Sequence, residues 1–166
     1  MTPTPPPQEL RDVPGHMPAA DRQASVAAAE PVLIALIDLA LQLKHAHWNL
    51  RGSNFIAVHE LLDDVADSVR NKSDLIAERI VQLGGEARGV LRFVNEHTSL
   101  PNFPTGAHDT DHLVTAVVQS MGQISRMLRE AIAQAGNAND EATADIFTET
   151  LREIDLKAWF LHAHLK

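Results

Sequence analysis

Apolar side chains recur at helical spacing over long stretches of this chain, and this periodicity constrains the fold more than any other feature. In the first stretch, Leu33, Leu36, Ala40, Leu43 and His47 follow one another at intervals of three and four positions. Such intervals place the side chains on one face of a helix, which then packs against a core. Similar stretches separated by glycine, asparagine and proline predict four long helices, at about residues 21–50, 55–83, 109–135 and 140–164.

The connection between the second and third predicted helices is much longer than the other two. Residues 86–108 are enough to carry the chain along the whole length of a bundle, and Pro101 and Pro104 stop regular structure near their end. The apolar residues around positions 90–94 predict a short helix inside this connection. The expected fold is therefore all-α, a four-helix bundle with one long crossover that carries a short helix.

The first twenty residues differ in composition from the rest of the chain. Residues 1–20 are rich in proline and lack a helical period, which predicts a flexible tail, and residues 21–166 are expected to form one bundle domain. No secretory signal is visible, and the most apolar run, residues 32–43, is interrupted by Asp38 and Gln42 and is too short to span a membrane. These features predict a soluble, cytoplasmic protein without a membrane partner.

Five side chains with metal-binding chemistry stand out: His47 on the first helix, and His59, Asp63, Asp74 and Glu78 on the second. The last four fall within one stripe of the helix, but the stripe is roughly 28 Å long at 1.5 Å per residue, so that one ion cannot contact both ends. They are arranged symmetrically about the midpoint between residues 68 and 69. An antiparallel second copy of the helix would therefore complete the set, which predicts a metal site between subunits.

The composition limits which metal such a site takes. The chain has no cysteine, so only histidine and carboxylate ligands are available, and these suit iron, manganese or zinc. Ordinary explanations exist for some members, since His47 alone is typical of a hydrogen-bonded core histidine, and His59 with Asp63 of a surface pair. Asp74 and Glu78 are different, because like charges four positions apart on a helix are unfavourable without a cation.

The segments AHWNLRG, FIAVHELLD and D-x-x-x-E-R, between residues 46 and 79, resemble the signature of the Dps family, the DNA-protection-during-starvation proteins or mini-ferritins. The resemblance implies a ferritin-like bundle that assembles into a hollow homododecamer. It also implies ferroxidase sites at two-fold interfaces, where two Fe(II) ions are oxidised, preferentially by hydrogen peroxide, before storage as ferric mineral. Carried over by position, His47, His59 and Asp63 come from one subunit, and Asp74 and Glu78 from its mate. Zinc or manganese remain alternatives for the resting protein.

Other polar and aromatic residues have two interpretations each. Trp48 either supports the metal site or packs in an interface. Asp145 and Glu149 either line an iron-entry pore or simply favour the start of the fourth helix through the helix dipole. Asp109, at the start of the third helix, is expected to cap it rather than to bind metal.

The charge of the chain separates two classes of function. A net charge of −8 and a tail without lysine disfavour binding to a phosphate backbone, so weak or absent DNA binding is expected. The alternative to an iron-oxidising protein is a structural, nucleoid-associated DNA-binding protein whose metal site is vestigial or holds a metal other than iron. Oxidation of Fe(II) by peroxide discriminates between the two.

Overall fold

Five helices account for most of the chain in the computed structural model, which describes residues 5–52 and 54–165. They are α1 (Ala19–Asn49), α2 (Phe55–Gln82), the short α3 (Leu91–His97), α4 (Thr110–Asn137) and α5 (Glu141–His162). The four long helices and the short helix in the crossover agree with the sequence prediction. The all-α, ferritin-like architecture is confirmed.

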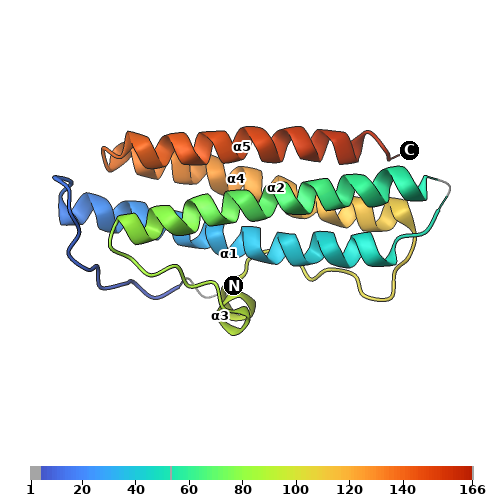
Figure 1. The fold of residues 1–166 in the computed structure, drawn as a ribbon, viewed down its shortest axis with the longest axis horizontal. Coiled ribbons are helices and arrows are strands. Elements are labelled where there is room, and N and C mark those ends of the chain that lie inside the picture. The colour runs from blue at the N-terminus through green and yellow to red at the C-terminus, as the bar shows by residue number, and fades with distance from the viewer. Residues whose placement is uncertain (1–4, 53, 166) are drawn as a thin grey trace.

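The long helices lie side by side as two antiparallel hairpins, α1 with α2 and α4 with α5 (Figure 1). Contacts between α1 and α4 and between α2 and α5 close the bundle. Helix α2 ends at the opposite end of the bundle from the start of α4, so the crossover runs the length of the molecule and places α3 on the outside of α1. One face of the α1–α2 hairpin is thereby left open beside α3.

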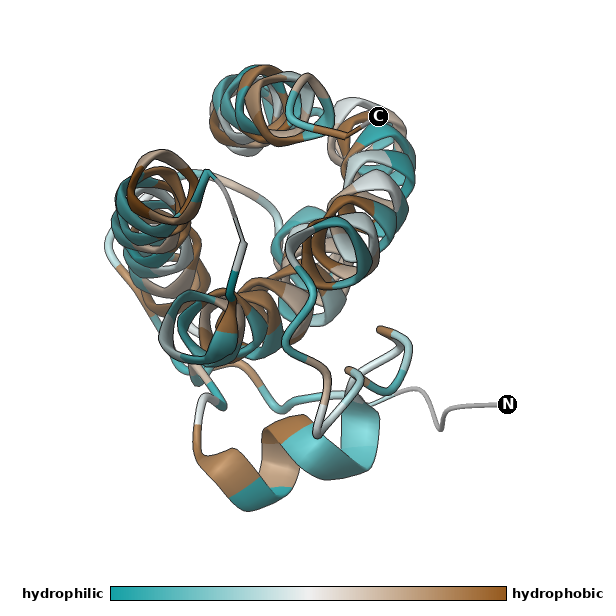
Figure 2. Cartoon of the chain, turned by 90° about the vertical axis from the view of Figure 1, so that its right-hand side faces the viewer, coloured by the Kyte–Doolittle hydropathy of each residue, from teal (hydrophilic) through white to brown (hydrophobic). Residues whose placement is uncertain are grey.

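The core is built from leucine, isoleucine, valine and alanine on the inward faces of all four long helices (Figure 2). Leu36, Leu39 and Leu43 of α1 are fully buried, as are Ile76 of α2 and Phe147 of α5. Burial of such side chains stabilises the bundle by about 1.5–3 kcal/mol each. The helices are thus held together by packing, and their outer faces are free to carry polar chemistry.

Helix α1 continues through Pro31, so this proline does not mark the start of the helix. It is also the one described helix that is long and apolar enough to cross a membrane by length and composition. Two thirds of its most apolar window, 67%, is buried inside the bundle, which is typical of a central helix in a folded domain.

The proline-rich segment before α1 contains no helix between residues 5 and 18. It runs along the outside of the bundle, where the backbone N–H of Arg11 donates to the carbonyl of Gly84 at 2.9 Å. Its flexibility stays a prediction, but its described part makes specific contacts with the bundle.

The start of α4 and the start of α5 are each capped by an aspartate. Asp109 accepts a hydrogen bond from the backbone N–H of His112 at 3.0 Å, so its expected role as a cap is confirmed. Asp140 accepts one from the N–H of Thr143 at 3.1 Å and also binds the guanidinium of Arg79 at 2.9 Å. These bonds satisfy N–H groups that have no partner inside the helix.

Candidate metal centre

Two histidines face each other where the end of α1 meets the start of α2. Nδ1 of His47 donates to the backbone carbonyl of His59 at 2.8 Å, and Nδ1 of His59 donates to the carbonyl of His47 at 3.0 Å. Because a carbonyl only accepts, both Nδ1 atoms carry the proton when the rings are neutral. Both Nε2 atoms therefore keep a free lone pair, which is the arrangement a metal-binding histidine requires.

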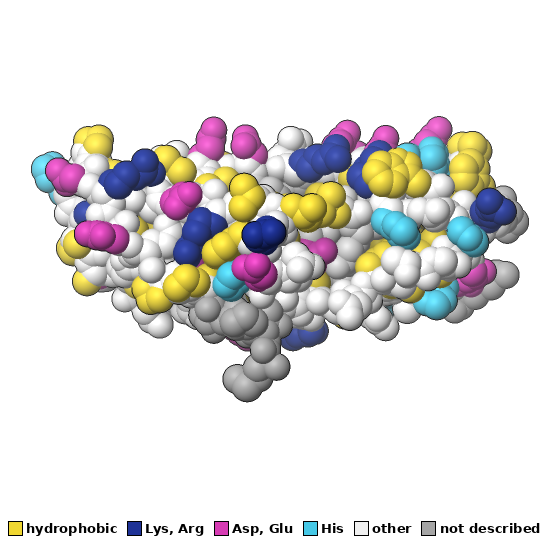
Figure 3. Space-filling model, turned by 90° about the horizontal axis from the view of Figure 1, so that it is seen from below, with side chains coloured by type: hydrophobic (Ala, Val, Ile, Leu, Met, Phe, Trp, Pro, Cys, Tyr) yellow, Lys and Arg dark blue, Asp and Glu magenta, His cyan; other side chains and the backbone are white. Residues whose placement is uncertain are grey.

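Ring stacking fixes the orientation of this histidine pair. The two imidazoles stack with centroids 3.7 Å apart and planes inclined by 19°, and the ring of Phe55 also stacks on His59, with centroids 5.0 Å apart. His47 is only 9% exposed, and His59 is half-buried. Figure 3 shows histidine side chains gathered near the end of the molecule where α1 passes into α2. The pair is a rigid, partly buried donor of two nitrogen ligands.

Asp63 lies one turn beyond His59 on α2 and is paired with Lys44 of α1. The hydrogen bond from the Lys44 ammonium holds the pKa of this carboxyl below its usual value, and the nearby charges of Lys44 and the two histidines act in the same direction. Asp63 is therefore ionised at neutral pH and available as an oxygen ligand. A metal ion that binds it must first displace the ammonium of Lys44 or share the carboxylate with it.

Asp74 and Glu78 lie further along α2 and are both exposed. Eleven residues of helix separate Asp63 from Asp74, about 16 Å along the axis, so a single ion cannot join the two. Within residues 5–52 and 54–165, no three histidine or carboxylate side chains come together in a group that could hold a metal ion. One chain thus brings His47 and His59 into contact, while Asp63 pairs with Lys44 one turn further along α2, and Asp74 and Glu78 lie further still.

An apolar groove lies between α1 and α2 beside Asp74. It has a volume of about 340 Å³, and Asp74 lies at its edge beside Ala77 and Arg70. Leu33, Ile37 and Leu41 of α1 form its apolar wall. Leu41 is half exposed, at 51%, and it extends the apolar wall of the groove to the surface.

The structure also shows where the three residues with two possible roles lie, namely Trp48, Asp145 and Glu149. Trp48 is 69% exposed next to the candidate centre, and the Lys44 ammonium lies 5.9 Å from the centroid of its ring. Asp145 and Glu149 are exposed on α5. Glu149 accepts a hydrogen bond from Lys72 of α2, which lowers the pKa of its carboxyl.

Sequence reasoning did not single out Lys44 or Phe55 as neighbours of the centre. A signal for Lys44 existed, because it lies three positions before His47 and therefore on the same face of α1. Phe55 gave the same kind of signal, since it lies four positions before His59 at the start of the second predicted helix.

Comparisons with known proteins give a consistent result. A family model described as "Ferritin-like domain" matches residues 31–166. The "DNA protection during starvation protein" of Agrobacterium fabrum (strain C58) is 42% identical over 150 residues, which cover 90% of this chain and 93% of that protein. Among solved structures, DpsA14 from Streptomyces coelicolor matches with a TM-score of 0.91 at 32% identity, covering 97% of this chain and 95% of that one. DpsC from the same organism matches with a TM-score of 0.90 at 29% identity, over 93% and 91% of the two chains.

Proposed function

This chain belongs to the ferritin-like family and, within it, to the Dps proteins, and on this premise we propose that it is a cytoplasmic ferroxidase that stores iron. Membership of this family supports iron storage and protection as the functions of the chain. The finer proposal is that Fe(II) is oxidised at sites between subunits, preferentially by hydrogen peroxide, and is kept as ferric mineral in a hollow homododecamer. Iron is here a substrate and cargo.

One observation carries the proposal: each chain presents two incomplete groups of ligands, symmetrically placed on the same face of α2. A two-fold axis near Ser68 and Val69 would bring His59 and Asp63 of one chain against the partner's Asp74 and Glu78. The apolar groove on this face, with Leu41 exposed beside it, offers the surface on which the second copy would pack. The like-charged pair Asp74 and Glu78 would then gain the cation that it needs.

The chemistry of the ligands suits iron. Two Nε2 lone pairs and three carboxylates bind Fe(II), and the carboxylate charges stabilise Fe(III) further. Reduction of one hydrogen peroxide to two hydroxide ions takes two electrons, and two Fe(II) ions supply one each. A site that holds both ions together delivers the two electrons as a pair and so avoids release of a hydroxyl radical. The fixed Nδ1 hydrogen bonds of His47 and His59 keep both rings oriented while the charge on the metal changes.

Iron has to enter the particle, and we assign Asp145 and Glu149 to that role. Both carboxylates are exposed, four positions apart on α5. Around a three-fold axis they would line an acidic channel that attracts Fe(II). Trp48, exposed beside the centre, belongs to the same proposal as a support of the site or of the interface.

Complementation between two inactive variants tests the proposal directly. Asp63→Asn disables one group of ligands and Glu78→Gln the other, so each pure variant is expected to lose peroxide-driven Fe(II) oxidation. In particles reassembled from an equal mixture, a site is intact when its first group comes from the Glu78→Gln chain and its second from the Asp63→Asn chain. Random pairing across the two-fold axis then restores about a quarter of the wild-type rate.

The matched control is Glu130→Gln, an exposed glutamate of α4 away from both groups, which should leave the rate unchanged. Ferric absorbance and peroxide consumption are followed together, with two irons expected per peroxide. A mixture that stays as inactive as its components would show that the site does not lie between subunits. Wild-type protein that oxidises Fe(II) no faster than buffer would remove the ferroxidase proposal itself.

A further inference from the structure

The segment before α1 is bound to the bundle by a defined set of hydrogen bonds. We call residues 5–13 of this segment the strap. Its Arg11 guanidinium donates to the carbonyl of Gly85 at 2.7 Å, in addition to the backbone bond with Gly84. The amide of Gln8 donates to Glu30 at 2.9 Å and to the carbonyl of Glu86 at 3.0 Å, and its oxygen accepts from the Glu86 N–H. The strap is therefore bound to the end of α2 and to α1 at the same time.

The two glycines after α2 leave the space in which the strap docks, because neither carries a side chain. Gly84 has a φ of 94°, and a Cβ there would lie 2.5 Å from the carbonyl oxygen of Arg11. A Cβ on Gly85 would lie 2.9 Å from Ile80 and 3.2 Å from the amide oxygen of Gln8. The strap thus passes too close to the end of α2 for any side chain other than hydrogen at Gly84.

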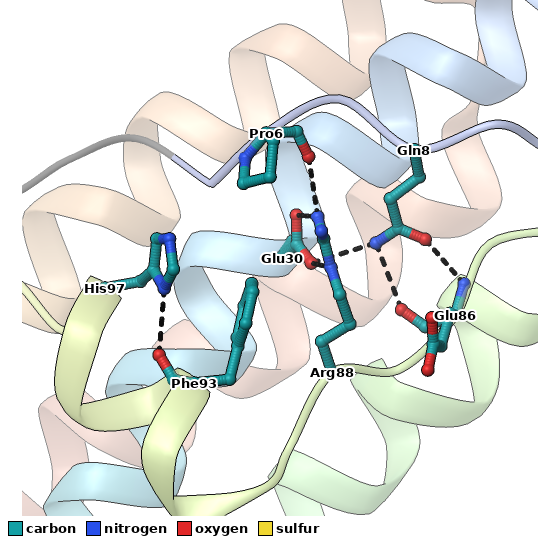
Figure 4. Close-up of polar contacts among 7 residues, drawn as sticks. All are labelled: Pro6, Gln8, Glu30, Glu86, Arg88, Phe93 and His97. Carbon is teal, nitrogen blue, oxygen red and sulfur yellow. Dashed lines mark hydrogen bonds and ion pairs between the residues drawn. The ribbon is translucent and has the colours of Figure 1, made fainter.

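Arg88 connects the strap to α1 and to α3 (Figure 4). Its guanidinium forms a two-pronged ion pair with Glu30, which is only 5% exposed, and donates to the carbonyl of Pro6 at 2.8 Å. It also lies 4.7 Å from the ring centroid of Phe93 in α3, and this ring stacks on His97. Such a pair gives fixed geometry, since a planar guanidinium binds a carboxylate in one orientation.

Helix α3 is short and has few other anchors. Val94 is buried against α1, and Thr98 at the end of the helix donates to Asp38 at 2.6 Å. These contacts hold the C-terminal half of α3. Its N-terminal half is held by the contact between Arg88 and Phe93 and by Leu91 beside Leu41, so Arg88 contributes to the position of Val90 and Leu91.

Val90 and Leu91 are exposed to 70% and 69%, which is unusual for large apolar side chains. Leu91 lies with Leu41 around a second groove of about 150 Å³, and Leu41 also lines the apolar groove that holds Asp74. The apolar surface is therefore continuous from α3 to the face on which the proposed two-fold partner packs. A second copy of this chain is the occupant that this continuity indicates.

We propose that Arg88 is a positioning residue through which the docked strap holds α3 in place for assembly with a second copy of the chain. This rests on the proposed two-fold assembly and adds to it a role for the N-terminal segment. Loss of the strap contacts removes the Pro6 carbonyl from Arg88 and the Gln8 amide from Glu30, and it exposes this ion pair to water, which loosens the start of α3 and misplaces Val90 and Leu91. Assembly then weakens although the bundle itself is unchanged.

The test uses the full chain with Gln8→Ala, which removes the three hydrogen bonds of Gln8 and leaves the core and the Arg88–Glu30 pair intact. Arg88→Gln is the second variant, and Arg126→Gln, an exposed arginine of α4, is its control for loss of one positive charge.

Sedimentation velocity over a dilution series measures assembly, and hydrogen exchange measures the protection of the backbone amides of residues 88–98. Both variants should dissociate at a protein concentration about tenfold higher than wild type. Exchange should be faster in residues 88–94 and unchanged in α2.

Each other outcome overturns the inference. Faster exchange without weaker assembly would mean that α3 is held by the strap but does not act on assembly. Weaker assembly without faster exchange would mean that the strap acts by another route. If Arg88→Gln fails to fold, Gln8→Ala alone decides. Wild-type chains that stay monomeric would refute the two-fold proposal as well, whereas normal assembly of both variants would refute only the role of the strap.

Discussion

At the scale of single residues, the candidate centre is organised by side chains that are not themselves ligands. The carbonyl groups of His47 and His59 fix the protonated nitrogen of the opposite ring, and Phe55 fixes the plane of the stack. Lys44 has the opposite effect, since its ammonium occupies one of the carboxylate oxygens that a metal would use. The site therefore combines ligands that are ready to bind with one internal competitor.

Replacement of Lys44 should strengthen metal binding. Lys44 lowers the pKa of Asp63, but an ordinary aspartate has a pKa near 4 and is ionised at pH 7 without that help. Lys44→Gln therefore removes a competitor and a repelling charge at no cost in ionisation. Because the Asp63 side chain is half exposed, water screens its charge, and the gain is modest, about two- to fivefold in affinity.

Titration calorimetry with Zn²⁺, which is redox-inactive, measures this affinity in the assembled protein at pH 7. Lys157→Gln is the control, since Lys157 of α5 is paired with Asp64, a carboxylate of α2 outside both groups of candidate ligands. Weaker Zn²⁺ binding by Lys44→Gln would show that Lys44 supports the site rather than competing for it.

At the scale of elements, the ion pair of Arg79 and Asp140 connects α2 to the start of α5. Burial of Asp140, which is 3% exposed, opposes its ionisation, but hydrogen bonds from Thr143 and the charge of Arg79 outweigh this and lower the pKa of the carboxyl. Arg79 directly follows Glu78 in the chain. Asp140, which caps α5, therefore also fixes through Arg79 the part of α2 that carries the second group of candidate ligands.

Asp140→Asn should destabilise the bundle by about 1–3 kcal/mol at neutral pH, because asparagine still caps the helix but leaves the charge of Arg79 unpaired. The folded pKa of Asp140 lies below its unfolded value, so its ionisation stabilises the fold above about pH 4. This contribution is lost as the pH falls through the lowered folded value. Between pH 7 and pH 3 the variant should therefore lose less stability than the wild type.

Thermal unfolding at fixed protein concentration, at several pH values, measures both effects. Asp155→Asn is the control, because Asp155 also binds an arginine, Arg129, but at the surface. Equal destabilisation by the two variants would show that the burial of Asp140 contributes nothing.

At the scale of the whole molecule, charge and assembly decide what the protein contacts. Each chain carries a net charge of −8, and repetition of the chain in an assembly multiplies the charge. The strap is fastened to the bundle through Gln8 and Arg11 and contains no lysine. We therefore expect the surface to attract metal cations and to repel phosphate backbones.

The intact protein should not retain plasmid DNA in a gel-shift assay at neutral pH and physiological salt. Lowering the salt about fourfold should not produce binding, since electrostatic repulsion increases as screening decreases. Retention that disappears when salt is added would instead show a basic surface formed by assembly, and would favour the nucleoid-associated alternative.

The parts of the fold and site that could be predicted from sequence are those set by local rules. Helical spacing of Leu33, Leu36 and Leu43 defined the first helix, and Asp109 was recognised as a cap from its position before a helix. The division of the ligands into two groups also followed from sequence, because the rise of a helix fixes how far apart Asp63 and Asp74 lie. Contacts such as Lys44 with Asp63, or Gln8 with Glu30, could not be predicted from local rules, because they join segments whose relative placement depends on packing.

The sequence by itself determined an all-α chain and a set of candidate ligands too widely spaced for one ion, because the periodicity and rise of a helix are local properties of the backbone. Only the tertiary structure decided that the backbone carbonyls of His47 and His59 fix the tautomer of the opposite ring and that Lys44 forms an ion pair with Asp63. It also decided where the proline-rich segment docks. These depend on how helices and loops far apart in the chain come to lie side by side, and that arrangement results from burial of the whole core.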